Sequence, residues 1–164
     1  MENLLRNIIV YIFKNYPNPL ELSKPRLVKI IYLIDWKNCI EHDKQTTPIQ
    51  WYFNHYGPYV DDIINYIKSD TDTFNLKSTY NIYGGVSHSI SLKEKITYDN
   101  NFLPEEGRKI IDFVIEKTFK LNWSEFISLI YSTYPISTQP KYTYLDLKSL
   151  SLEYKKTLKE STLA

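Results

Sequence analysis

The chain has 164 residues, of which 20 are basic and 19 acidic, and its net charge is +1. This balance gives no overall field that would draw the protein onto nucleic acid or an anionic membrane, and only Arg6, Arg26 and Arg108 are arginines. A single cysteine, Cys39, excludes an internal disulfide and favours a reducing cytoplasm, where we expect the thiol to be a small buried side chain.

The first segment, residues 1–16, is predicted to be a helix of the core. Leu5, Ile8 and Ile12 recur at helical spacing, and the apolar run is interrupted and too short to span a bilayer. No small-residue cleavage site follows it. The helix should end before Pro17, because proline disfavours helical geometry in the residue ahead of it.

The next helix, from Pro25 to about Glu41 with Ser23 as N-cap, is predicted to be the most buried element. Its apolar residues occupy more than one stripe, as expected for a helix with neighbours on most sides. They are Leu27, Val28, Ile30, Ile31, Tyr32, Leu33, Ile34 and Trp36.

A short strand should follow, because Ile49, Trp51 and Phe53 alternate with polar or amphipathic residues. The pair Gly57-Pro58 is interpreted as a corner between this strand and a third helix, since glycine accepts unusual backbone angles and proline suits the first helical position.

The order of these elements carries a family resemblance. The helix VKIIYLIDW (28–36), a polar loop, an aromatic strand and YGPYV (56–60) together resemble the Panacea domain, the SocA-like antitoxin family. Its members carry a K-L-L-Y-L-A-D-like helix followed by a G-P-V-like turn. The segment LIYSTYP (129–135) is similar to the end of a C-terminal helix in that family, whereas Tyr59 departs from its usual small or branched residue.

The resemblance implies a non-enzymatic, cytoplasmic antitoxin-like protein without a cofactor. Such a protein binds a toxin or a defence-related protein and neutralises it, directly or as an adaptor that hands it to a protease, and some members occur in phage defence systems. The alternative is a nucleic-acid-binding regulator of its own operon, which the neutral charge and scarce arginine disfavour.

Beyond the third helix, residues 79–83 and 86–92 are predicted to form a hairpin around Gly84-Gly85. In its second arm the even-numbered residues should form a buried face: Val86, His88, Ile90 and Leu92. We expect this hairpin to join the Trp51 strand in one small antiparallel sheet.

The C-terminal part is predicted to be helical. One helix follows Pro104, and a second begins at Asn122, where Glu125 completes a capping box, and stops at Pro135. The fold class is therefore α+β: a mainly helical single domain, 1–164, with a small antiparallel sheet or hairpin. Residues 138–164 are expected to be a looser extension that ends in an amphipathic helix.

The sequence offers no catalytic or metal-binding constellation. His42, His55 and His88 are scattered at spacings unlike those of zinc ligands, so we interpret them as structural histidines. The adjacent carboxylates Asp61 and Asp62 would diverge by about 100° on a helix, and we assign them to the helix end.

Tyrosine is abundant, with 15 residues, and the densest cluster surrounds Gly57-Pro58. Two interpretations stay open at this point: the rings cover the sheet, or they form a patch that binds a protein partner. In the second interpretation the partner-binding residues are Tyr52, Tyr56, Pro58 and Tyr59, with Tyr52 on the strand face opposite Trp51.

Overall fold

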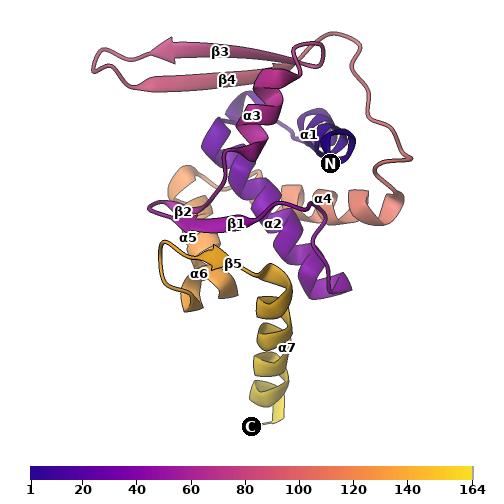
Figure 1. The fold of residues 1–164 in the computed structure, drawn as a ribbon, viewed down its shortest axis with the longest axis vertical. Coiled ribbons are helices and arrows are strands. Elements are labelled where there is room, and N and C mark those ends of the chain that lie inside the picture. The colour runs from indigo at the N-terminus through magenta and orange to yellow at the C-terminus, as the bar shows by residue number, and fades with distance from the viewer. Residues whose placement is uncertain (164) are drawn as a thin grey trace. The chain divides into compact units, whose positions relative to one another are not determined.

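The computed structural model describes residues 1–163, and Figure 1 shows their arrangement into helices and short strands. The helices are α1 (Glu2–Asn15), the short 3-10 helix η1 (Pro19–Glu21), α2 (Lys24–His42), α3 (Asp62–Ser69), α4 (Glu105–Thr118), α5 (Trp123–Ser132), α6 (Tyr134–Thr138) and α7 (Leu147–Leu163). The strands are β1 (Trp51–Asn54), β2 (Gly57–Tyr59), β3 (Phe74–Tyr80), β4 (Val86–Leu92) and β5 (Tyr144–Leu145). The predicted α+β, mainly helical class is confirmed. No helix in residues 1–163 is both long and apolar enough to cross a membrane.

The chain forms two compact units, each assembled from separate stretches of sequence. The first unit contains Met1–Val28 and Asp61–Phe119, and the second contains Lys29–Val60 and the chain from Lys120 onward. Helix α2 begins in the first unit and continues in the second.

The first unit has a core of isoleucines. Ile8, Ile9 and Ile12 of α1 are fully buried, and Tyr11 on the same helix donates a hydrogen bond of 2.7 Å to Asp112 of α4. The predicted first helix is confirmed, including its end before Pro17, because α1 stops at Asn15.

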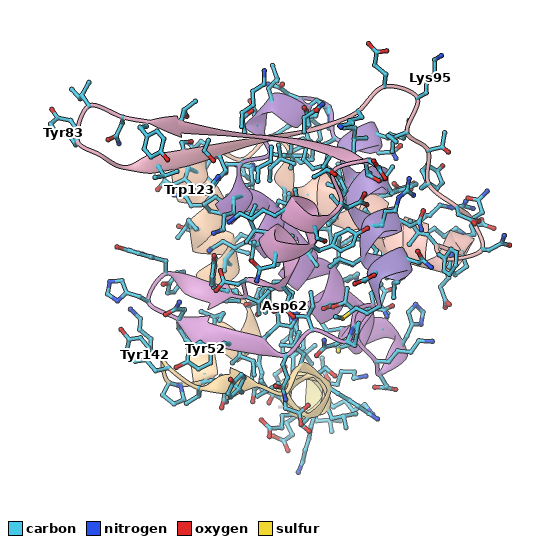
Figure 2. All side chains as sticks on the ribbon, turned by 45° about the horizontal axis from the view of Figure 1, so that its top comes forward. Tyr52, Asp62, Tyr83, Lys95, Trp123 and Tyr142 are labelled. Carbon is cyan, nitrogen blue, oxygen red and sulfur yellow. The ribbon has the colours of Figure 1, made fainter. Side chains whose placement is uncertain are left out.

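The β3–β4 hairpin also lies in the first unit, and two expectations about it were wrong. It forms a two-stranded sheet of its own, while β1 pairs elsewhere. The expected apolar face is buried only near its base: Ile90 is 5% exposed, whereas Val86 is 52% exposed. The reason is that only the base of the hairpin, at Phe74 and Ile90, contributes to the core, while its tip carries exposed residues such as Tyr83 (Figure 2).

The part of α2 in the second unit is buried nearly all round, as predicted. Ile30, Ile31 and Ile34 are all 0% exposed, and so is Cys39 near the end of the helix. Burial raises the pKa of the Cys39 thiol to about 12, which makes it an inert core side chain.

The second sheet has the strand order β2-β1-β5, and all its pairings are antiparallel. The interpretation of Gly57-Pro58 as the start of a helix was wrong, because both residues belong to β2 and helix α3 begins only at Asp62. Gly57 has φ +101°, a value that residues with a Cβ rarely adopt. The glycine therefore serves the tight β1–β2 hairpin.

The capping box at Asn122 is confirmed. Its side chain accepts a hydrogen bond of 2.9 Å from the Glu125 amide, and the Glu125 carboxylate accepts one of 2.9 Å from the Asn122 amide. Pro135 does not end this helix directly: α5 stops at Ser132, and the proline lies in the first turn of α6. Farther on, β5 pairs with β1, and α7 buries Leu147 and Leu150.

Candidate functional site

The second sheet is held to α2 by one buried carboxylate, Asp35, which is 0% exposed. It accepts hydrogen bonds from the Thr47 amide at 2.8 Å, from the Thr47 hydroxyl at 2.6 Å and from the Trp51 indole at 2.8 Å. Burial raises the pKa of Asp35 to about 6, against the effect of these donors. The Asp35 side chain thus fixes the start of β1 on the helix.

The inner face of this sheet is apolar and closed. Trp51 and Phe53 of β1 are 0% and 3% exposed, and their strand neighbours Pro58 and Leu145 are also buried. The Trp51 ring meets Tyr32 edge to face, with centroids 5.5 Å apart. This face belongs to the core of the second unit.

The outer face carries one tyrosine from each strand, and we call Tyr52, Tyr59 and Tyr144 the tyrosine face. In the strand register Tyr52 of β1 lies opposite Tyr59 of β2 on one side and opposite Tyr144 of β5 on the other. The Tyr52 and Tyr144 rings make an edge contact, with centroids 5.1 Å apart. Tyr52 and Tyr59 are half-buried and Tyr144 is exposed, so part of each of these side chains is accessible to solvent.

Three more aromatic residues extend this row at the hairpin end. The Tyr142 amide donates to the Phe53 carbonyl, and its hydroxyl lies 3.1 Å from Nδ1 of His55. His55 in turn contacts the exposed ring of Tyr56, with centroids 4.6 Å apart. Figure 2 shows Tyr52 and Tyr142 on the same side of the sheet. We call His55, Tyr56 and Tyr142 the rim.

The residues predicted to bind a partner take different positions in this arrangement. Tyr52 lies on the face opposite Trp51, as expected, and Tyr59 pairs with it. Tyr56 is 76% exposed at the turn. Pro58, in contrast, is buried opposite Phe53, so it supports the surface from the inner face.

Sequence reasoning did not include three members of the surface: His55, which was interpreted as a structural histidine, and Tyr142 and Tyr144. The signal available was the alternation of Tyr142 and Tyr144 with Thr143 and Leu145, which is typical of a short strand. Nothing in the alternation tells which strand it joins, since that pairing forms between segments far apart in the chain.

The tyrosine face and the rim together consist of five tyrosines and one histidine. A surface that binds a nucleic acid backbone needs cations, whereas tyrosine is enriched where proteins meet. The chemistry of this surface therefore favours a protein partner.

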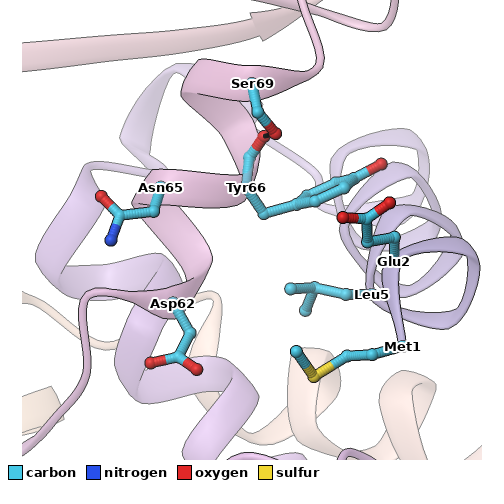
Figure 3. Close-up of a pocket in the computed structure, with 7 residues that line it drawn as sticks. All are labelled: Met1, Glu2, Leu5, Asp62, Asn65, Tyr66 and Ser69. Atoms are coloured by element: carbon cyan, nitrogen blue, oxygen red, sulfur yellow. Dashed lines mark hydrogen bonds between the residues drawn. The ribbon is translucent and has the colours of Figure 1, made fainter.

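A hollow of about 410 Å³ lies in the first unit, between the start of α1 and helix α3 (Figure 3). Its lining residues are Met1, Glu2, Leu5, Asp62, Asn65, Tyr66 and Ser69. Of the predicted helix-end carboxylates only Asp62 lines it, and Asp61 precedes α3 as N-cap. No group of three metal-ligating side chains occurs within residues 1–163.

Comparison with known proteins agrees with the resemblance. No curated protein and no solved structure matches the chain significantly. A family model described as antitoxin SocA-like, Panacea domain, matches residues 27–135, which is more than half of the chain. The match includes Asp35, Trp51 and the β1–β2 hairpin, and it confirms the predicted family. The chain therefore belongs to the SocA-like antitoxin family with the Panacea domain.

Proposed function

We propose that this chain is a cytoplasmic antitoxin that binds its toxin through the tyrosine face and the rim, and neutralises it by that contact. Family membership supports an antitoxin role in general, and with it a protein partner and a non-enzymatic action. The observation that carries the finer proposal is the row of Tyr59, Tyr52 and Tyr144 across three strands.

This row suits protein recognition because its backbone is fixed before binding. The inner side chains of the same strands are buried, and the sheet is tied to α2 through Asp35. Rings held on a rigid sheet lose little conformational freedom when a partner covers them. Tyrosine also offers a hydroxyl that can hydrogen-bond at the edge of the contact.

The test is rescue of cells that express the toxin, identified as the neighbouring gene product that this chain neutralises. The double variant Tyr52→Ala and Tyr59→Ala should lose about 2 kcal/mol or more of binding, which is roughly a thirtyfold weaker complex. We expect it to fail in rescue while its thermal midpoint stays within a few degrees of the parent.

A matched control removes two tyrosines from the β3–β4 hairpin, Tyr80→Ala and Tyr83→Ala. Both are exposed, at 76% and 90%, and they lie in the other unit. The control should rescue at the parent's level. Full rescue by the folded Tyr52 and Tyr59 variant would place the toxin-binding surface elsewhere, and loss of folding would assign those two rings to the core.

Direct neutralisation and delivery to a protease differ in the fate of the toxin. We expect the amount of toxin in rescued cells to stay constant, because contact alone blocks it. A fall in toxin amount that requires a cellular protease would instead identify an adaptor.

A further inference from the structure

A lysine and an aspartate of the second unit, Lys29 and Asp35, are buried on α2, and they differ in their partners. Asp35 is surrounded by hydrogen-bond donors from Thr47 and Trp51. Lys29 is 3% exposed, yet within residues 1–163 its amine takes part in no hydrogen bond or ion pair. A buried charge without a partner is costly, so an apolar residue would fill this position more favourably.

The end of the Lys29 stem lies beside Gly57 of the β1–β2 hairpin, at a place that α5 also reaches. A Cβ placed on Gly57 would lie 3.7 Å from Cε of Lys29, and equally 3.7 Å from side-chain atoms of Ile130 and Tyr131. The amine is one bond beyond Cε. Its site is therefore beside Gly57, where the hairpin meets the last turns of α5.

The amine is not fully enclosed. Within residues 1–163, Oγ1 of Thr46 is the side-chain polar atom that is both fully buried and without a hydrogen bond. The Lys29 amine also has no hydrogen bond, but it is not among the fully buried atoms. The Lys29 amine therefore keeps some accessible surface, although the residue as a whole is only 3% exposed. Burial of the rest of the side chain lowers the pKa of Lys29 to about 8.

The end of the Lys29 side chain is next to the proposed binding surface. Gly57 directly follows Tyr56, a rim residue that is 76% exposed. A protein that covers the rim would bring its own side chains to the Lys29 tip. The neighbouring Ile130 and Tyr131 supply no second cation, so the site matches a single negative charge rather than a phosphate.

We propose that Lys29 receives a carboxylate of the toxin, from an Asp or Glu side chain, at the Gly57 end of the β1–β2 hairpin. This inference rests on the proposed function, since it names the charge that the toxin must present. The incoming carboxylate would supply the anion that the folded antitoxin lacks, and its pairing with Lys29 would be shielded from water by the covered rim.

The direct test follows the titration of Lys29 by NMR, with lysine labelled at Cε, in the free full-length chain and in its complex with the purified toxin. A carboxylate partner favours the charged form, so the pKa of Lys29 should rise from about 8 toward its ordinary value of 10.5 on binding. An unchanged or lower pKa in the complex would overturn the proposal. An equal rise in the pKa of Lys29 when acetate is added to the free chain, without toxin, would overturn the proposal and identify a site for small free anions.

The second test uses Lys29→Met, which keeps a flexible chain of similar volume without the charge. We expect its thermal midpoint to equal or exceed that of the parent and its affinity for the toxin to fall tenfold or more. The matched control is Lys37→Met on the same helix, since Lys37 pairs with Glu41 at 2.5 Å and should leave the affinity unchanged.

The two proposals fail in different ways. Normal toxin binding by Lys29→Met, together with lost binding by the Tyr52 and Tyr59 variant, would refute the Lys29 inference and keep the tyrosine face. Normal binding by both variants would refute both. A Lys29→Met chain that does not fold leaves the decision to the NMR titration of the parent.

Discussion

The two faces of the β2-β1-β5 sheet use aromatic residues in opposite ways. On β1 the inner side chains Trp51 and Phe53 are almost completely buried, and Trp51 donates to the buried Asp35. The outer side chain, Tyr52, contacts the Tyr144 ring from the neighbouring strand and stays partly open to solvent. Strand β1 thus stabilises the second unit with its inner side chains and leaves its outer side chain accessible to a partner. Substitutions on the inner face should therefore change stability, and those on the outer face should change toxin binding.

The largest effect is expected from Trp51→Ala on the inner face. The indole is 0% exposed, and its removal leaves a cavity and takes one of the hydrogen-bond donors away from the Asp35 carboxylate. We expect the free energy of unfolding to fall by about 3–5 kcal/mol. Urea unfolding followed by circular dichroism would measure it, and a loss below about 1 kcal/mol would contradict the contrast between the faces.

Asp35→Asn should come next, because it keeps the shape of the side chain but turns one acceptor into a donor. One or more of the donors on Thr47 and Trp51 would then face an amide N–H. A loss of about 1.5–3 kcal/mol is expected, the range for hydrogen bonds to a charged group. Chemical denaturation at pH 7 would test this value.

The same variant should change how stability depends on pH. The pKa of Asp35 is about 6 in the folded chain and near 3.8 without the fold, so between about pH 4 and pH 6 the folded state holds more protons. The stabilisation that comes from the raised pKa of Asp35 is therefore fully present below about pH 4 and is lost as the pH rises through about 6, whereas the hydrogen bonds to the carboxylate remain. Parent and variant curves that run parallel over this window would refute the assignment.

A smaller effect is expected at a position that belongs to neither face. Asn122→Ala removes the N-cap of α5 and leaves the Glu125 amide without its side-chain acceptor. The free energy of unfolding should fall by about 1 kcal/mol, with toxin affinity unchanged. Thermal unfolding and a binding titration on the same sample would show whether the two properties separate here.

The smallest change in stability should follow Tyr144→Ala on the outer face. Its ring is 69% exposed, so we expect a change within about 0.5 kcal/mol. The affinity for the toxin should nevertheless fall, because Tyr144 completes the row beside Tyr52. Unaltered affinity would restrict the binding surface to β1, β2 and the rim.

The sequence by itself determined the elements whose signals are local. Helix α2 was predicted from a run of apolar residues between Pro25 and Glu41, and its burial followed from the width of that run. The start of α5 was predicted because Asn122 and Glu125, three residues apart, complete the same capping box in any fold that contains it. The alternation around Trp51 likewise separated Tyr52 from Trp51 and Phe53, because side chains point to opposite faces in any strand.

The tertiary structure alone decided which segments meet. Taken as an isolated dipeptide, Gly57-Pro58 is compatible with the start of a helix and with a strand. Pairing with β1 made it part of strand β2. Tyr144 entered the tyrosine face because β5 reached β1 from the far end of the chain. Lys29 became a buried residue without a hydrogen bond because its stem lies beside Gly57, which is distant in the sequence. These outcomes depend on contacts between distant residues, whose free energies are set by packing in the folded chain and leave no periodicity in the sequence.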